Sequence, residues 1–211
     1  MTASDDMHFP SHIHRLVTGD DLTASPLVLL HGSGGREQDL MPLAQDLTPK
    51  RSILAVRGAI RWDGGFAFFR RFADRSIDEV DLRKNATELA SFTEGVRVKC
   101  GFGKPPIAVG FSNGAIMASA LLLMRPSMFG GAILLRPLSP FLDELQSEIS
   151  GTPVLVIDGE LDTRRSPGDG DRLAERLRQA GARVEHHTLP IGHAITAQDS
   201  QIARKWIERS L

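Results

Sequence analysis

A short apolar run that ends in Gly-x-Ser-x-Gly is the feature that most constrains the fold of this chain. Residues 107–114 read Ile-Ala-Val-Gly-Phe-Ser-Asn-Gly, and an apolar stretch from Ala115 to Met124 follows at once. A strand, a tight turn with a serine at its tip and then a helix form the setting in which a serine becomes a nucleophile. The two glycines leave room where the chain doubles back, so the sequence predicts that the Ser112 hydroxyl projects clear of a sheet.

Apolar runs that suit buried strands alternate with segments of helical periodicity along the chain. Strands are expected over residues 12–17, 27–30, 52–56, 107–109, 131–135, 152–157 and 183–189, and helices over 39–47, 77–98, 115–124, 171–180 and 197–209. Unbroken apolar strands are typical of a parallel sheet with helices on both faces, whereas the alternating 12–17 strand suits an edge. The pattern predicts an α/β fold with a mostly parallel central sheet. Residues 1–11 are expected to form a flexible N-terminus, and residues 12–211 a single domain.

Residues 61–75 fit neither period and are expected to form a long loop over one edge of the sheet. This segment holds Trp62, Phe66, Phe68, Phe69 and Phe72 among Arg70, Arg71 and Arg75. Long irregular segments in compact domains are often functional. We expect Phe66, Phe68, Phe69 and Phe72 to wall an apolar pocket with Arg70 or Arg71 near its mouth, and packing of the same rings in the core is the equal alternative. In the helix that follows, the expected core residues are Ile77, Val80, Leu82, Leu89, Phe92 and Val96.

Composition argues against several classes of partner. The chain has 25 basic and 26 acidic residues, a net charge of −1, which gives no electrostatic reason to bind nucleic acid or an anionic membrane. A single cysteine, Cys100, fits a reducing compartment, and residues 1–10 lack the apolar core of a signal peptide. The longest apolar run is too short to cross a bilayer. We therefore expect a cytoplasmic protein without membrane insertion.

Three chemically suited side chains, Ser112, Asp162 and His193, each follow the end of a predicted strand. Ligands in folds of this kind bind at the carboxyl ends of the strands. A serine hydroxyl needs a base to take its proton, and the base needs a third group to orient it. His193 would be that base and Asp162 the orienting acid, and the chain order Ser, Asp, His is that of α/β-hydrolases.

Other residues compete for these roles. Asp158 and Glu160 share the strand-end loop with Asp162, and His186 and His187 lie within the last predicted strand. A reaction of this type also needs two donors for the developing oxyanion. We expect the backbone N–H of Asn113 and, from the glycine-rich turn at residues 31–35, the backbone N–H of Ser33. His31 is expected only to shape that turn.

Taken together, these motifs resemble the phospholipase/carboxylesterase family of α/β-hydrolases, which are relatives of acyl-protein thioesterases. The resemblance rests on residues 29–35 with 39–40, on 69–72 (Phe-Arg-Arg-Phe), on 110–115, on 159–162 (Gly-Glu-Leu-Asp) and on 192–193. The motifs at residues 69–72 and 110–115 are most similar to the bacterial carboxylesterase branch of this family. The resemblance implies an α/β-hydrolase fold without a large lid domain, with Ser112, Asp162 and His193 as the triad.

The same resemblance implies a serine esterase that cleaves small carboxylic esters through an acyl-enzyme, with no metal or organic cofactor. A homodimer is compatible with it. The alternatives are a thioesterase acting on acyl-CoA or acylated protein, and a binding protein that has kept the fold without catalysis. One departure from the family follows Asp162, where Thr-Arg-Arg-Ser-Pro replaces an apolar loop. Solvated arginines on the rim are the favoured interpretation of Arg164 and Arg165, and recognition of an anionic substrate is the alternative.

Overall fold

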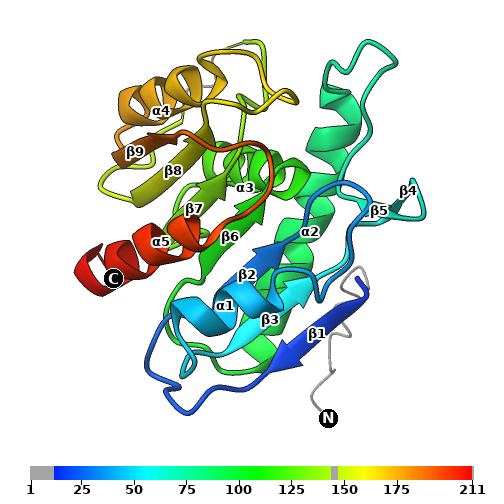
Figure 1. Ribbon diagram of the computed structural model, residues 1–211. Coiled ribbons are helices and arrows are strands. Elements are labelled where there is room, and N and C mark those ends of the chain that lie inside the picture. The colour runs from blue at the N-terminus through cyan, green and yellow to red at the C-terminus, as the bar shows by residue number, and fades with distance from the viewer. Residues whose placement is uncertain (1–11, 144–146, 211) are drawn as a thin grey trace.

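Seven strands form one sheet in the computed structural model of the chain, which describes residues 12–143 and 147–210 (Figure 1). They are β1 (His14–Val17), β2 (Leu27–Leu30), β3 (Ile53–Val56), β6 (Ile107–Phe111), β7 (Gly131–Leu135), β8 (Pro153–Gly159) and β9 (Arg183–Leu189). Their order is β1-β3-β2-β6-β7-β8-β9, and every neighbouring pair is parallel except β1 with β3. The α/β-hydrolase fold, the mostly parallel sheet and the edge strand are confirmed. The prediction for residues 1–11 lies outside the described residues.

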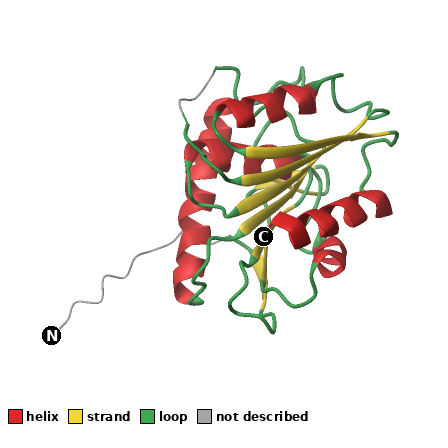
Figure 2. Cartoon of the chain, turned by 90° about the vertical axis from the view of Figure 1, so that its left-hand side faces the viewer, coloured by secondary structure: helices red, strands yellow, loops and turns green. Residues whose placement is uncertain are grey.

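Helices cover both faces of this sheet (Figure 2). One face carries α2 (Glu79–Lys99), α3 (Asn113–Met124) and α4 (Asp169–Gln179), and the other carries α1 (Met41–Leu47) and α5 (Ala197–Ser210). Alternate residues of each strand enter the two cores: in β2, Val28 and Leu30 pack on one side and Leu27 and Leu29 on the other. Burial on both faces explains why these strands read as unbroken apolar runs.

The segment expected to be a long loop contains a hairpin instead, so that part of the prediction is wrong. Strands β4 (Ile60–Trp62) and β5 (Gly65–Ala67) pair antiparallel, with Trp62 opposite Gly65. The two residues between them, Asp63 and Gly64, both have positive φ (45° and 74°). An Asp-Gly pair with this backbone is a preferred two-residue turn because its twist matches that of the strands. The hairpin is tied to the turn after β2, since the N–H of Gly34 donates to the carbonyl of Phe66.

The prediction that Val80 of α2 lies in the core is also wrong. Leu82, Leu89 and Phe92 are buried, but Val80 is 82% exposed. The helix begins beside Asp78, whose side chain accepts a hydrogen bond from the N–H of Asp81. Val80 lies two positions before Leu82, about 200° away around a helix that turns about 100° per residue, and therefore faces solvent.

Two further properties concern the described residues alone. Across residues 12–143 and 147–210, no helix combines the length and apolar character needed to span a bilayer. The same ranges hold no group of three or more His, Cys, Asp or Glu side chains arranged to bind a metal ion.

Candidate active site

Ser112 occupies the sharp turn between β6 and α3. Its φ of 52° and ψ of −109° are rare for a residue with a side chain, and its N–H donates to the carbonyl of Leu135 in β7 at 2.9 Å. A Cβ added to Gly114 would lie 1.9 Å from the carbonyl oxygen of Leu30, and one added to Gly110 would lie 2.6 Å from that of Gly114. Both glycines are therefore required because the backbones approach too closely for any side chain.

Replacing Gly114 with alanine is expected to lower the free energy of unfolding by about 2 kcal/mol, because backbone atoms would have to shift. The shift would also displace Ser112. Urea unfolding should measure this loss against Gly103→Ala, since a Cβ at Gly103 meets nothing within 4 Å. Equal stability of the two variants would contradict the argument from close packing.

The structure brings together the three side chains that the sequence singled out. His193 Nε2 lies 3.0 Å from Ser112 Oγ, and His193 Nδ1 lies 2.6 Å from Asp162 Oδ2. The Asp162 side chain is 1% exposed, and its second oxygen accepts the N–H of Arg164 at 2.8 Å. The carboxylate partner assigns the imidazole proton to Nδ1, which leaves the lone pair of Nε2 directed at the serine hydroxyl.

The competing residues have other partners. His186 Nε2 lies 2.7 Å from Asp158 Oδ2, and His187 Nε2 lies 2.8 Å from a carboxylate oxygen of Glu185. Glu160 is exposed on the strand-end loop. The side chains of His186, His187 and Asp158 therefore interact with partners other than Ser112 and His193.

Burial lowers the pKa of His193 below its ordinary value of 6.5, although the Asp162 carboxylate acts in the opposite direction. A general base must be neutral, so activity is lost as the pH falls through the pKa of the free enzyme. We expect the acid limb of kcat/KM for a neutral ester to have its midpoint below pH 6.5. A pH profile from 4.5 to 9 in buffers of constant ionic strength tests this, and a midpoint above 7 would contradict it.

His31 supports the turn after β2, as expected. It is 1% exposed; Nδ1 donates to the carbonyl of Gly32 at 2.7 Å, and Nε2 accepts the N–H of Gly58 at 3.0 Å. Both ring nitrogens are thus used within the scaffold. Ser33, two residues on, is exposed and borders the same cavity as Ser112.

The Asn113 side chain ties the start of α3 to the residues after β5. Its Oδ1 accepts the N–H of Phe68 at 2.8 Å, and its Nδ2 donates to the carbonyl of Phe69 at 3.4 Å. The side chain is therefore fixed on the backbone behind the turn. The N–H of Asn113, as the first of the helix, has no acceptor within the helix.

A cavity of about 450 Å³ opens beside Ser112. It is lined by Ser33, Trp62, Arg71, Phe72, Ala73, Arg75, Ser112, Asn113, Arg164 and Arg165. Of the residues expected to form the pocket, Phe72 and Arg71 belong to this lining. Phe69 is 1% exposed in the core, the Phe66 ring lies 4.7 Å from the guanidinium carbon of Arg57, and Arg70 pairs with Asp81 at 3.4 Å. The pocket prediction is corrected for Phe66, Phe69 and Arg70. Phe68 and Phe69 pack in the core, as the alternative had it, and Trp62 at the end of β4 joins the lining instead.

Arg165 does not have the solvated position favoured from the sequence. Its Nε donates to the carbonyl of Arg136 at 2.8 Å, and its Nη2 donates to Ser112 Oγ at 3.1 Å. Burial, reinforced by the positive charge of Arg71, lowers the pKa of Arg165 to about 10. Its neighbour Arg164 is exposed, as expected.

Arg136, which the sequence analysis missed, holds the loop that carries His193. It follows β7 and is 0% exposed, and its guanidinium pairs with the equally buried Asp199 of α5 at 2.8 Å. The same group donates to the carbonyls of Gly192 at 3.2 Å and Ala194 at 3.0 Å, one on each side of His193. The sequence signal that could have identified Arg136 is its position directly after an apolar strand.

Comparison with known proteins agrees with this architecture. The family model described as Phospholipase/Carboxylesterase matches residues 70–211. MhqD of Bacillus subtilis is 32% identical over 201 residues, covering 95% of this chain and 98% of MhqD. A Bacillus cereus carboxylesterase superposes with a TM-score of 0.92 at 32% identity, covering 98% of this chain and 96% of that one. A carboxylesterase from Mesorhizobium loti gives a TM-score of 0.87 at 30% identity, over 92% and 93% of the two chains. The chain belongs to the phospholipase/carboxylesterase family.

Proposed function

We propose that this protein is a serine hydrolase that cleaves small carboxylic esters. The observation that carries the proposal is the continuous contact from Ser112 Oγ through the imidazole of His193 to the buried carboxylate of Asp162. Membership of a carboxylesterase family supports an ester as the substrate class. In this proposal Ser112 is the nucleophile, His193 the general base and Asp162 the group that orients it.

The first half-reaction forms an acyl-enzyme. Ser112 Oγ attacks the ester carbonyl carbon while His193 Nε2 takes the hydroxyl proton. The tetrahedral intermediate then breaks its bond to the alcohol oxygen, which receives that proton from Nε2. In the second half-reaction, water attacks the acyl group with the same base, and the carboxylic acid leaves.

The oxyanion would be bound by the backbone N–H groups of Asn113 and Ser33. Both residues line the cavity with Ser112. The N–H of Asn113 begins α3, whose positive end favours negative charge at that point. Loss of one such donor typically lowers kcat by about 100- to 1,000-fold. The turn after β2 is therefore as important for this function as the turn that carries Ser112.

A fluorophosphonate probe tests the proposal directly, since it labels only a serine whose hydroxyl is activated. We expect one label per chain, located on Ser112 by peptide mass spectrometry, and parallel loss of hydrolysis of p-nitrophenyl acetate. The urea-unfolded protein is the control and should not be labelled. Absence of label on the folded protein would remove the enzymatic proposal, and an acyl-CoA assay in the same series separates thioester from ester cleavage.

We also propose that residues 12–211 form one domain that acts in the cytoplasm. The single cysteine, which fits a reducing compartment, supports the second part of this proposal. Assembly into a homodimer, which the family resemblance allows, can be decided by sedimentation analysis at micromolar concentration.

A further inference from the structure

The cavity beside Ser112 has a strongly biased charge. Four arginines, Arg71, Arg75, Arg164 and Arg165, line it together with Trp62, Phe72 and small or polar residues, and no aspartate or glutamate of residues 12–143 and 147–210 belongs to this lining. The chain as a whole has a net charge of −1, so the cluster does not follow from a basic composition. A cavity lined in this way raises the local concentration of anions.

These four guanidinium groups form no direct ion pair with the carboxylates that the structure describes. In the described part of the chain, no carboxylate lies within 4.0 Å of any of them. Arginines elsewhere do pair, as Arg57 does with Glu37 at 2.5 Å and Arg97 with Glu94 at 2.7 Å. Some of the N–H donors are used within the protein: Arg165 donates to the carbonyl of Arg136 and to Ser112 Oγ, and Arg71 donates to the carbonyl of Arg75. The cluster keeps its charge and its remaining donors available to a ligand.

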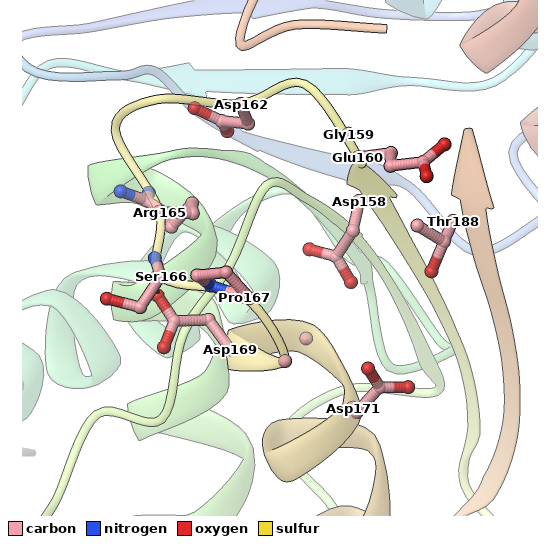
Figure 3. A pocket seen from close by; sticks show the side chains of 12 residues that line it. Asp158, Gly159, Glu160, Asp162, Arg165, Ser166, Pro167, Asp169, Asp171 and Thr188 are labelled. Carbon is pink, nitrogen blue, oxygen red and sulfur yellow. Dashed lines mark hydrogen bonds between the residues drawn. The ribbon is translucent and has the colours of Figure 1, made fainter. Parts of the chain in front are cut away.

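The carboxylates that act on Arg71 and Arg165 from a distance line a second, smaller cavity of about 170 Å³, which Arg165 also borders (Figure 3). Each of them is already engaged: Asp158 by His186 at 2.7 Å, Asp162 by His193 at 2.6 Å, and Asp169 by Arg172 at 2.5 Å. These carboxylates moderate the charge on Arg165 from a distance. They leave the side of the guanidinium that faces Ser112 without an anion.

Two of these arginines, Arg71 and Arg165, are substantially buried. Burial lowers the pKa of Arg71, and burial together with the charge of Arg71 lowers that of Arg165 to about 10. Both effects mean that the charged forms are poorly solvated and repel each other. A bound anion would relieve both, and the planar guanidinium fork is well matched to carboxylate and phosphate oxygens.

We propose that the substrate is an ester that carries a second, ionised acid group, and that Arg71, Arg75 and Arg165 bind this group beside Ser112. The proposal rests on the esterase function above and narrows its substrate class. Arg165 Nη2 lies 3.1 Å from Ser112 Oγ, so the anion sits only a few atoms from the scissile carbonyl. A short half-ester of a dicarboxylic acid fits: water and the half-ester give the dicarboxylate, the alcohol and a proton.

Matched substrates provide the first test. Monomethyl succinate and dimethyl succinate share a skeleton and differ in one charge at pH 7.5. We expect wild-type kcat/KM for the half-ester to exceed that for the diester by at least about 10-fold, since a hydrogen bond to a charged group accounts for roughly 10- to 100-fold. Arg71→Gln and Arg75→Gln should lower this ratio about 10-fold, chiefly through KM. Arg75 is exposed, so its variant remains informative if the Arg71 variant folds poorly.

Arg125→Gln is the matched control. Arg125 is exposed and follows the far end of α3, and its loss changes net charge by the same amount. It should leave the substrate ratio at the wild-type value. A diester hydrolysed as fast as the half-ester in a Ser112-dependent reaction would overturn the substrate class while leaving the esterase proposal intact.

Direct binding separates the two proposals further. Titration calorimetry of the wild-type protein with succinate, and separately with inorganic phosphate, should show binding that weakens about 10-fold in Arg71→Gln and in 0.5 M NaCl but not in Arg125→Gln. Preference for phosphate would support the anion site and identify a phosphorylated ester as its source. If Ser112→Ala retains wild-type hydrolysis, the esterase proposal fails, whereas the titration still decides the anion site. If neither succinate nor phosphate binds, the proposed anion site is overturned.

Discussion

Replacing Ser112 with alanine is expected to lower kcat for a short ester by about 10⁵- to 10⁶-fold, because the variant has no atom to form the acyl bond. The remaining donors and the cavity would still bind ester and leave a small residual rate. Steady-state release of p-nitrophenol, corrected for the buffer reaction, measures the loss. Circular dichroism should be unchanged, since the alanine occupies less space at the same turn.

Ser119→Ala is the internal control for this result. Ser119 lies in the same helix, is 0% exposed and donates only to the carbonyl of Ala115. Its variant should keep activity within about twofold. Groups that act as one unit are not additive, so Ser112→Ala combined with His193→Ala should be no slower than Ser112→Ala alone. Activity of Ser112→Ala within tenfold of wild type would contradict the assigned nucleophile.

Replacing Arg136 with alanine is expected to lower the free energy of unfolding by about 3–5 kcal/mol, because it leaves the carboxylate of Asp199 buried and unpaired. For a domain of this size, that corresponds to a fall in Tm of about 10 °C. The carbonyls of Gly192 and Ala194 would lose their donor as well. We therefore expect kcat to fall about 100-fold even at temperatures where the variant is folded, since a displacement of about 1 Å in the base is that costly.

The exposed pair of Arg178 with Glu175, 3.7 Å apart, supplies the control for stability. Surface pairs contribute at most about 1 kcal/mol, so Arg178→Ala should change neither Tm by more than a few degrees nor kcat. Differential scanning calorimetry and assays at 15 °C provide the two readouts. A Tm for Arg136→Ala equal to that of Arg178→Ala would show that the buried pair is not needed.

Features encoded by local patterns were predictable from the sequence. The apolar period of the strands and the glycines at 110 and 114 are readable without coordinates, because strand alternation and steric limits act over a few residues. The position of Ser112, Asp162 and His193 at one edge follows, since parallel strands end together. The hairpin was missed for a local reason: residues 61–75 as a whole fit neither period, whereas the pair Asp63-Gly64 within them is a turn signal.

Features that depend on long side chains could not be predicted. Arg165 reaches Ser112 across 53 positions of sequence, and Arg136 reaches Asp199 across 63. Which way an arginine extends is decided by carbonyls and carboxylates from distant elements, and no periodicity records them. The same holds for Phe69, whose backbone supports Asn113 while its ring enters the core.

The dependence of the His193 loop on α5 sets an order of events during synthesis. Asp199 leaves the ribosome after all strands of the sheet, and Arg136 has no buried counter-ion until α5 docks. A domain generally folds as a unit. The loop with His193 is therefore fixed only once α5 supplies Asp199 to Arg136. The histidine proposed as the proton acceptor of Ser112 is thus held in place only when α5 packs against the sheet.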